Sequence, residues 1–355
     1  MTNNNVFVDI HVIQTIPPSN INRDDTGSPK TAVYGGVSRA RVSSQSWKKA
    51  MRDYFREHYS DENHIGIRSK RIVTYIADEI QKIDDSIDDK KAIDMAKKVF
   101  NNTGAVKSID KELKQDTLFL ISKVQAKNLA QAAINKLSKK EELQEILNKN
   151  ISLDIALFGR MVASNQVLGV DASSQVAHGI STHEVNTEFD FYTAVDDLNP
   201  EDTSGAGMLG TIEYNSSTLY RYANVSAHEL NKQLQEESES TVEAISMFIE
   251  SFIKSVPTGH INSFAHQTVP QAVVVSVRKD RPVNLVTAFE EPVRSKGGYV
   301  KESIKRLSEE FNTVQKFSDK PALTLTIGVN EIGEEKENLE ELIKKFSSEI
   351  ESLIK

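Results

Sequence analysis

The chain contains no cysteine, so disulfide bonds, thiolate zinc sites and a cysteine nucleophile are excluded. Proline and glycine are sparse, at 9 and 16 of 355 residues, which excludes collagen-like and wholly disordered chains. No apolar run approaches the roughly 18 residues of a membrane helix, and residues 1–14 lack the features of a signal peptide. We therefore expect a soluble, cytoplasmic protein of about two structural units, with no membrane partner.

Charge is distributed unevenly along the chain. A formal net charge of -8 argues against a nucleic-acid binder, because phosphate affinity comes mainly from Lys and Arg. Residues 30–56, however, carry seven basic residues against the single acid Asp53, whereas residues 331–355 carry eight Glu against four Lys. This polarity fits either a basic groove on an acidic body or head-to-tail contact between copies of the chain.

The N-terminal region is predicted to form a strand and a loop. Apolar residues alternate over residues 6–13, which predicts a strand with one apolar face. Residues 17–36 are rich in Pro, Ser, Asn, Asp and Gly, and we expect a long loop there.

A helix is expected after this loop, with Ser43 or Ser44 as its N-cap. From Trp47 onward, apolar residues recur at helical spacing and predict a buried face. Basic residues stack four apart on another face, namely Lys48, Arg52 and Arg56. One side of this helix is therefore expected in the core and another is cationic.

Residues 60–149 contain two glycines and no proline, which predicts a helical insertion. Its helices are expected at residues 72–83, 92–100, 117–137 and 141–150. Residues 151–225 break into short strand-forming pieces. Within them, residues 196–210 are turn-forming almost throughout and end in Met208 and Leu209 at an expected exposed tip.

The C-terminal region alternates helices and strands. Residues 242–256 have a strong helical period, which predicts a helix packed on a sheet. Strands are expected at residues 271–277 and 322–329, followed by a terminal helix over residues 339–350. Without the insertions the order is strand, helix, strands, helix, strand, which indicates an α+β fold with a split sheet of the RNA-recognition (RRM-like, ferredoxin-like) type.

Two groups of residues were weighed as metal sites. His178 and His183 are five apart, which is not the spacing of a zinc-protease helix, so we interpret them as structural or surface histidines. Asp24 and Asp25, with Asp9 and His11, are compatible with a Mg²⁺-dependent nuclease. An ordinary Asx turn is the stronger interpretation of this loop. The sequence has no G-x-S-x-G motif and no P-loop.

Two segments suggest nucleic-acid binding, although each has a simpler explanation. Residues 41–52 place hydroxyls and backbone amides at a helix start followed by cations, an arrangement that binds phosphates. A solvated cationic helix face is equally compatible. Phe191 and Tyr192 lie at the base of the turn-rich segment, where they either pack in a core or subunit contact or stack on bases.

Several blocks of the sequence, taken together, resemble a known family. They are residues 22–25 (NRDD), 35–36 (GG), 41–52 (RVSSQSWKKAMR), 154–161 (DIALFGRM), 193–197 (TAVDD) and 220–224 (YRYAN). In order and spacing these blocks resemble the CasC family, the backbone subunit of the type I-E CRISPR Cascade complex.

The resemblance implies a hand-shaped protein with an RRM-like palm, a helical fingers insertion and a β-hairpin thumb. The implied boundaries are 1–59 palm (first part), 60–172 helical fingers insertion, 173–192 palm, 193–222 thumb hairpin and 223–355 palm (second part) with the C-terminal helix.

The resemblance also implies site residues. The implied RNA-binding residues are Arg23, Lys30, Arg41, Ser43, Gln45, Lys48, Lys49 and Arg52. Residues implied to pack against bases or form the thumb are Met161, Phe191, Tyr192, Met208 and Leu209. Val37 and Ser38 stand where relatives carry basic side chains, so the contact to the RNA backbone there is expected to be either weaker or made by Arg39.

The function implied is that of a non-enzymatic scaffold without cofactor or bound metal. Its expected partners are CRISPR RNA, other copies of itself, other Cascade subunits and, through the guide, target DNA. The alternative hypothesis is a metal-dependent endoribonuclease of the type III backbone kind that uses Asp24 or Asp25. A protein-only assembly factor is a third hypothesis.

Overall fold

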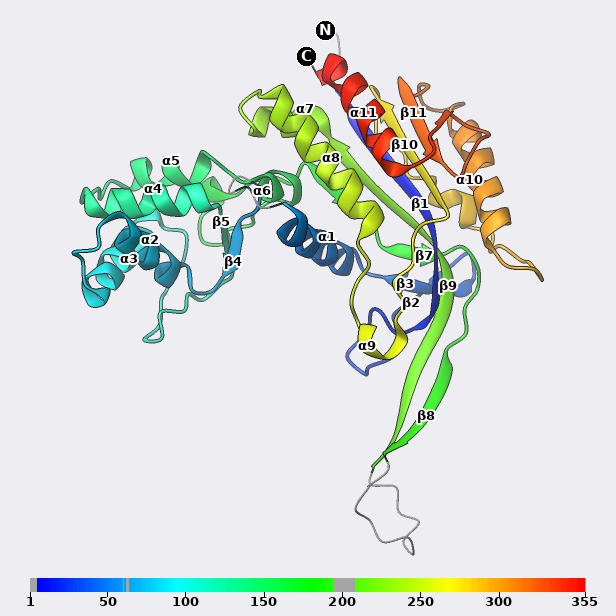
Figure 1. The fold of residues 1–355 in the computed structure, drawn as a ribbon, viewed down its shortest axis with the longest axis horizontal. Coiled ribbons are helices and arrows are strands. Elements are labelled where there is room, and N and C mark those ends of the chain that lie inside the picture. The colour runs from blue at the N-terminus through cyan, green and yellow to red at the C-terminus, as the bar shows by residue number, and fades with distance from the viewer. Residues whose placement is uncertain (1–4, 60, 62–63, 195–207, 355) are drawn as a thin grey trace, which may run out of the picture. The chain divides into compact units, whose positions relative to one another are not determined.

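The computed structural model describes residues 5–59, 61, 64–194 and 208–354 (Figure 1). The chain divides into two compact units. The first comprises Met1–Met51, Val176–Asn224 and Ile249–Glu349, and the second comprises Arg52–Gln175, Val225–Phe248 and Ile350–Lys355. Among the residues described, no helix combines the length and the apolar content needed to cross a bilayer.

A large mixed sheet forms the first unit. Its strands follow the order β12-β11-β10-β1-β9-β7-β3-β2, and β6 and β8 each pair with β9. β1 and β10 are antiparallel, whereas β11 and β12 are parallel. The strands are β1 (Phe7–Ser19), β2 (Thr31–Tyr34), β3 (Val37–Val42), β6 (Ser174–Val176), β7 (Gly179–Ser181), β8 (Glu188–Ala194), β9 (Met208–Ser226), β10 (Ala272–Arg278), β11 (Leu323–Ile327) and β12 (Glu334–Glu335).

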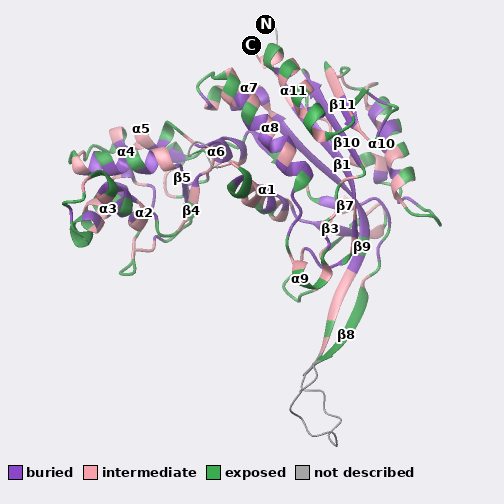
Figure 2. Cartoon of the chain, viewed as in Figure 1, coloured by how far each residue is buried: buried purple, intermediate pink, exposed green. Residues whose placement is uncertain are grey.

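The first strand is central in this sheet and is buried on both faces (Figure 2). Val8, Ile10 and Val12 lie on one face of the strand. Asp9, His11 and Ile13 lie on the other face, and all of these residues are buried. The prediction of a single apolar face was therefore wrong, because the face that carries Ile13 packs against a core that includes Phe289 and Leu307. β1 also continues through Pro17 to Ser19, where a loop was expected.

The remainder of the predicted loop contains a hairpin. β2 pairs antiparallel with β3, and Tyr34 lies opposite Val37. The two connecting residues, Gly35 and Gly36, both have positive φ angles, of 59° and 78°. Two-residue hairpin turns require such angles, and glycine adopts them without steric strain.

Helices in the first unit pack on the sheet. η2 (Leu285–Phe289) and α10 (Val300–Val314) join a core with Ile13 and Val274 on one face. α10 was not predicted. The expected helices were confirmed as α1 (Ser44–His58), α8 (Ser238–Lys254) and α11 (Leu339–Ile354), each of which has residues in both units, and the short α9 (Ile261–Phe264) follows α8.

A buried arginine ties α1 to the sheet. The Arg221 guanidinium on β9 lies 3.8 Å from the Trp47 ring centroid and 4.5 Å from that of Phe252. Its Nη1 donates to Gln14 Oε1, and its Nη2 donates to the carbonyl oxygen of Phe252. Burial lowers the pKa of Arg221 to about 9, so the group stays charged at neutral pH.

The second unit has a helical core (Figure 1). The short strands β4 (Ile67–Ser69) and β5 (Phe119–Ile121) pair antiparallel beside it. β5 occupies part of the predicted helix 117–137, because the helix starts only at the Ser122 cap. The helical elements are α2 (Ile72–Ile83), α3 (Asp89–Thr103), α4 (Lys123–Ile134), α5 (Lys140–Asn148), α6 (Leu153–Phe158), η1 (Gln166–Leu168) and α7 (Ala227–Gln233). α6 lies where short strand pieces were expected.

Asp154 on α6 forms a buried ion pair inside the second unit. Its Oδ2 lies 2.9 Å from Arg52 Nη2, and the two side chains are 0% and 12% exposed. Its Oδ1 accepts from the Gly66 amide at 2.8 Å and from the Ser152 hydroxyl at 2.6 Å. The carboxylate is therefore fully engaged, and it holds the C-terminal part of α1 within this unit.

We predict that Asp154→Asn destabilises the protein by about 3 kcal/mol, because removing one partner leaves the Arg52 charge buried without its counterion. Asp53→Asn is the matched control, since Asp53 pairs with Arg56 at 3.0 Å on the exposed side of the same helix. Exposed pairs contribute roughly 0.2 to 1 kcal/mol. Urea unfolding measures both changes, and equal losses in the two variants would contradict the prediction.

We also predict that Arg221→Lys lowers the unfolding midpoint. A lysine ammonium cannot stack its charge between two rings and reach two acceptors together, and a desolvated cation–π contact is worth about 2 kcal/mol. Trp47 is the only tryptophan of the chain, so its fluorescence reports on this contact directly. The exposed Arg281→Lys is the control. An unchanged emission spectrum and midpoint in Arg221→Lys would refute the assignment.

Candidate nucleic-acid interface

The start of α1 presents polar groups next to a buried apolar face. The Ser43 carbonyl accepts from the amides of Ser46 and Trp47 at 3.0 and 3.2 Å, and the Ser43 amide donates to Asn22 Oδ1 at 2.8 Å. Gln45 and Lys49 are exposed, and Lys48 is half-buried, which lowers its pKa. The predicted helix start and its buried face are confirmed, whereas the predicted cationic face is only partly exposed, because Arg52 is largely buried against Asp154.

Several of the seven cations between residues 30 and 56 have structural partners, and Arg41 is one of them, because its Nε donates to the Thr31 carbonyl oxygen at 3.2 Å. Arg39 is fully buried, and its donors reach the carbonyl oxygens of Tyr34, Ser181, Phe289 and Glu290. The expectation that Arg39 contacts nucleic acid was therefore wrong. Arg52 is bound by Asp154, and Arg56 pairs with Asp53. Lys30, Arg41, Lys48 and Lys49 remain at least partly exposed.

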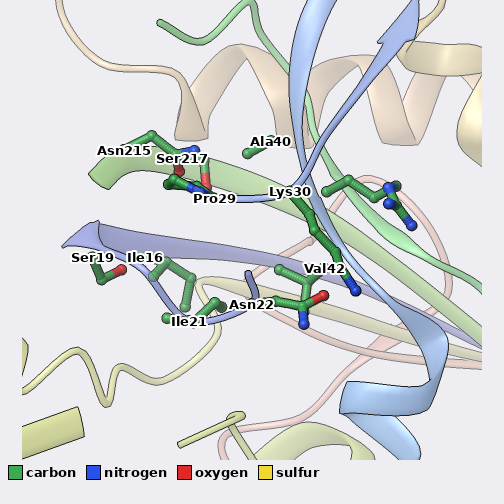
Figure 3. A pocket seen from close by; sticks show the side chains of 11 residues that line it. Ile16, Ser19, Ile21, Asn22, Pro29, Lys30, Ala40, Val42, Asn215 and Ser217 are labelled. Carbon is green, nitrogen blue, oxygen red and sulfur yellow. The ribbon is translucent and has the colours of Figure 1, made fainter. Parts of the chain in front are cut away.

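Lys30 and Arg41 lie beside each other on adjacent chain segments. The Arg41 amide donates to the Lys30 carbonyl at 2.9 Å, which extends the β2–β3 ladder by one pair. Both residues line a small pocket whose wall includes Asn22, Asn215 and Ser217, as Figure 3 shows for the labelled side chains. This pocket combines two cations with amide and hydroxyl groups, the usual partners of phosphate and sugar oxygens.

His178 lies in the positive electrostatic field of Lys30 and Arg41. Its Nδ1 accepts from the Ser44 amide at 3.2 Å. Burial lowers the pKa of His178 first, and the charges of Arg41 and Lys30 lower it further. The imidazole is therefore within electrostatic reach of both cations. His178 is exposed, which agrees with its interpretation as a structural or surface histidine, although that interpretation did not anticipate the two neighbouring cations.

The NRDD loop forms a closed turn. Asp24 Oδ1 accepts from the Thr26 amide and hydroxyl at 2.9 and 2.7 Å, and from the Ser28 amide at 3.1 Å. The Thr26 hydroxyl is the main cause of the lowered pKa of Asp24. Asp25 is exposed, and Arg23 bonds to His260 Nε2 at 2.5 Å. The Asx-turn interpretation is confirmed.

Asp9 and His11 do not accompany this loop. Both are fully buried. Asp9 lies 3.2 Å from Arg278 Nε and accepts from the Tyr222 hydroxyl at 2.7 Å. His183 is also buried, stacked 3.6 Å from the Tyr299 ring. In the described part of the chain, no three His, Asp or Glu side chains gather as a metal site.

The β8–β9 ribbon extends from the sheet, and β8 is coloured as exposed (Figures 1 and 2). Phe191 is 65% exposed and lies opposite Thr211, whereas Tyr192 lies opposite Gly210. Neighbouring residues of a strand point to opposite faces, so Phe191 and Tyr192 cannot pack on the same face of the ribbon. Phe189, also 65% exposed, shares the face of Phe191 and was missed by the sequence analysis.

Tyr192 explains the glycine opposite it. A Cβ atom on Gly210 would lie 2.4 Å from the Tyr192 hydroxyl oxygen and Cζ, so the ring lies across the glycine. Met208 and Leu209 pair with Ala194 and Thr193 in the backbone ladder. Their side chains, and the turn-rich residues 195–207, lie outside the described part of the chain. Met161 belongs to the second unit and is 89% exposed.

Comparisons with known proteins give one family and two related structures. A chain of a solved "CRISPR RNA-guided surveillance complex, pre-nicking" matches with a TM-score of 0.85 and 31% identity, covering 96% of this chain and 99% of that chain. A chain of another "CRISPR RNA-guided surveillance complex" matches with a TM-score of 0.74 and 28% identity over the same shares. No curated protein matched. The family model described as CT1975-like protein matches residues 8–355. The chain therefore belongs to the CT1975-like protein family.

Proposed function

We propose that this chain binds CRISPR RNA as the backbone subunit of a Cascade-type surveillance complex. The likeness to chains of CRISPR RNA-guided complexes, which extends over 96% of this chain, supports the role. The residue blocks that resemble the CasC family narrow the proposal to the type I-E complex. The palm, fingers and thumb division, with an RRM-like palm, belongs to this proposal.

The observation that carries the proposal is the pair of adjacent cations Lys30 and Arg41, together with Lys48 and Lys49 on the first turns of α1. A protein with a net charge of -8 needs such a local surface to attract a polyanion. Contacts to phosphate carry no sequence information, so one surface accepts every guide sequence. Ser43 and Gln45 supply the neutral polar groups that position a sugar-phosphate chain.

The ribbon contributes stacking surfaces. Exposed aromatic rings bind bases of any sequence, at about 1 to 3 kcal/mol for each base. Phe191 and Tyr192, on opposite faces, would each contact a different base or a different segment of the strand. In this proposal several copies of the chain line one RNA, and the bases left exposed pair with target DNA.

We further propose that the protein is a scaffold and not a nuclease. In the endoribonuclease hypothesis Asp24 or Asp25 binds the catalytic metal. Asp24 uses Oδ1 to accept three hydrogen bonds within its own turn, and this engagement supports a structural role.

Removal of the α1 cations is expected to weaken RNA binding. Replacement of Lys48 and Lys49 by Gln should reduce the slope of log affinity against log salt by about 0.7 for each lysine, since each phosphate contact on a single strand contributes that amount. Filter binding of a single-stranded RNA at several salt concentrations measures this slope. Arg52 is unsuitable for this test, because its substitution breaks the buried pair with Asp154.

Lys97 and Lys98 on α3 provide the matched control, because they are also adjacent and have the same half-buried and exposed pattern as Lys48 and Lys49. Lys97→Gln with Lys98→Gln should leave the salt slope unchanged. Equal reductions in both double variants would indicate a nonspecific charge effect and would count against this surface.

Incubation of the purified complex with complementary RNA and Mg²⁺ is expected to yield no cleavage that depends on the NRDD loop. The comparison is Asp24→Asn with Asp25→Asn, because Asn retains an oxygen that accepts the hydrogen bonds of the turn. The amount of cleaved RNA on a denaturing gel should be the same for the unaltered protein and the double variant. Cleavage that disappears in the variant would support the endoribonuclease hypothesis instead.

A further inference from the structure

His178 shares one face of the sheet edge with the cations Lys30 and Arg41. Arg41 on β3 lies opposite Ile180 on β7, and Lys30 extends the same ladder on the other side of Arg41. Side chains alternate between faces along an extended chain, so His178, two residues before Ile180, lies on the face of Arg41. Three side chains that can donate hydrogen bonds to an anion therefore gather on this face.

A hydrogen bond fixes the protonation state of the His178 ring. Its Nδ1 accepts from the Ser44 amide at 3.2 Å, so Nδ1 carries no proton and the neutral ring carries its proton on Nε2. A protonated ring would have N–H groups at both positions and could not accept from Ser44. Protonation of His178 therefore breaks this bond and leaves the Ser44 amide as a donor.

Charged groups around the ring oppose its protonation. Arg41 of β3 and Lys30 of the preceding segment both repel a positive imidazole. Lys48 lies one turn after Ser44 on α1, and the buried Arg221 of β9 lies beneath the adjacent Gly179. Of these four cations, Arg41 and Lys30 are the ones whose charges lower the pKa of His178. A phosphate bound by Lys30 and Arg41 would reverse the sign of the field at the ring.

We infer that His178 is a proton-linked contact of the RNA backbone, and this inference rests on the proposed function. In the free protein, the Ser44 amide donates its hydrogen bond to His178 Nδ1, which occupies the position that an anion would take. When RNA binds, a phosphate oxygen replaces Nδ1 as the acceptor of the Ser44 amide. The displaced ring takes one proton from solvent at Nδ1 and donates to the same phosphate group.

The sign of the resulting pH dependence follows from linkage. Burial, Arg41 and Lys30 lower the pKa of His178 in the free protein, whereas a bound phosphate raises it. RNA binding then takes up a proton in the window between the two pKa values. The additional affinity is fully present below the pKa of the free protein and is lost as the pH rises through the pKa of the complex.

The test measures the salt dependence of binding between the full-length protein and a short single-stranded RNA of mixed sequence at about pH 6 and about pH 8, which bracket histidine titration. In the unaltered protein the slope should be steeper by about 0.7 at the lower pH, because one more cation meets a phosphate. In His178→Gln the slope should be the same at both pH values, since Gln keeps an acceptor for Ser44 and gains no charge.

His58→Gln is the control, because His58 is exposed at the far end of α1 and should behave as the unaltered protein does. Asp9, whose pKa burial raises to about 6, titrates in all three proteins and cancels in the comparison. If the pH effect is equal in His178→Gln and the unaltered protein, or absent from both, the role of His178 is overturned and the proposed function is unaffected. Failure of all three proteins to bind RNA would overturn the proposed function as well.

Discussion

The position of the Arg221 guanidinium between the rings of Trp47 and Phe252 is the interaction on which the rest of the first unit depends. A buried charge is costly unless hydrogen bonds and polarisable groups replace its hydration. Here two ring faces, an amide oxygen and a carbonyl oxygen do so. Because Trp47 lies on the helix that carries the candidate lysines, and Arg221 lies on the strand that continues into the ribbon, one contact orients both parts of the candidate interface.

Buried arginines explain why a count of basic residues overstates the surface charge. Arg39 and Arg160 are buried against carbonyl oxygens, and Arg52 against a carboxylate. Two of the blocks that resemble the CasC family, residues 154–161 and 220–224, contain Asp154, Arg160 and Arg221. Those blocks therefore coincide with residues whose buried contacts connect elements of the fold. Their likeness to relatives is informative about architecture, and in the proposed function RNA contacts are left to the cations that remain exposed.

Helices with a strong apolar period were predictable from the sequence. The bounds of α2 match residues 72–83, and α8, α11 and the start of α1 were also found. The two-sided burial of β1 was not predictable, because the residues of η2 and α10 that pack on its second face are distant in the chain. The Gly35–Gly36 hairpin could have been recognised from its glycine pair. At the candidate site, helical spacing located the lysines, but the partner of Arg52 lies 102 positions away and no local pattern reveals it.

β9 runs without interruption for 19 residues, from the sheet into the ribbon. Tyr220 of β9 lies opposite Ile180 of β7, which in turn lies opposite Arg41 of β3. Further along β9, Thr211 lies opposite Phe191 of β8. At about 3.3 Å for each residue, the cationic and aromatic positions are at most roughly 30 Å apart along the strand. That interval is set by backbone geometry and not by a hinge. The strand therefore fixes the distance between the two positions. Any polymer that contacts both positions must span the same length each time.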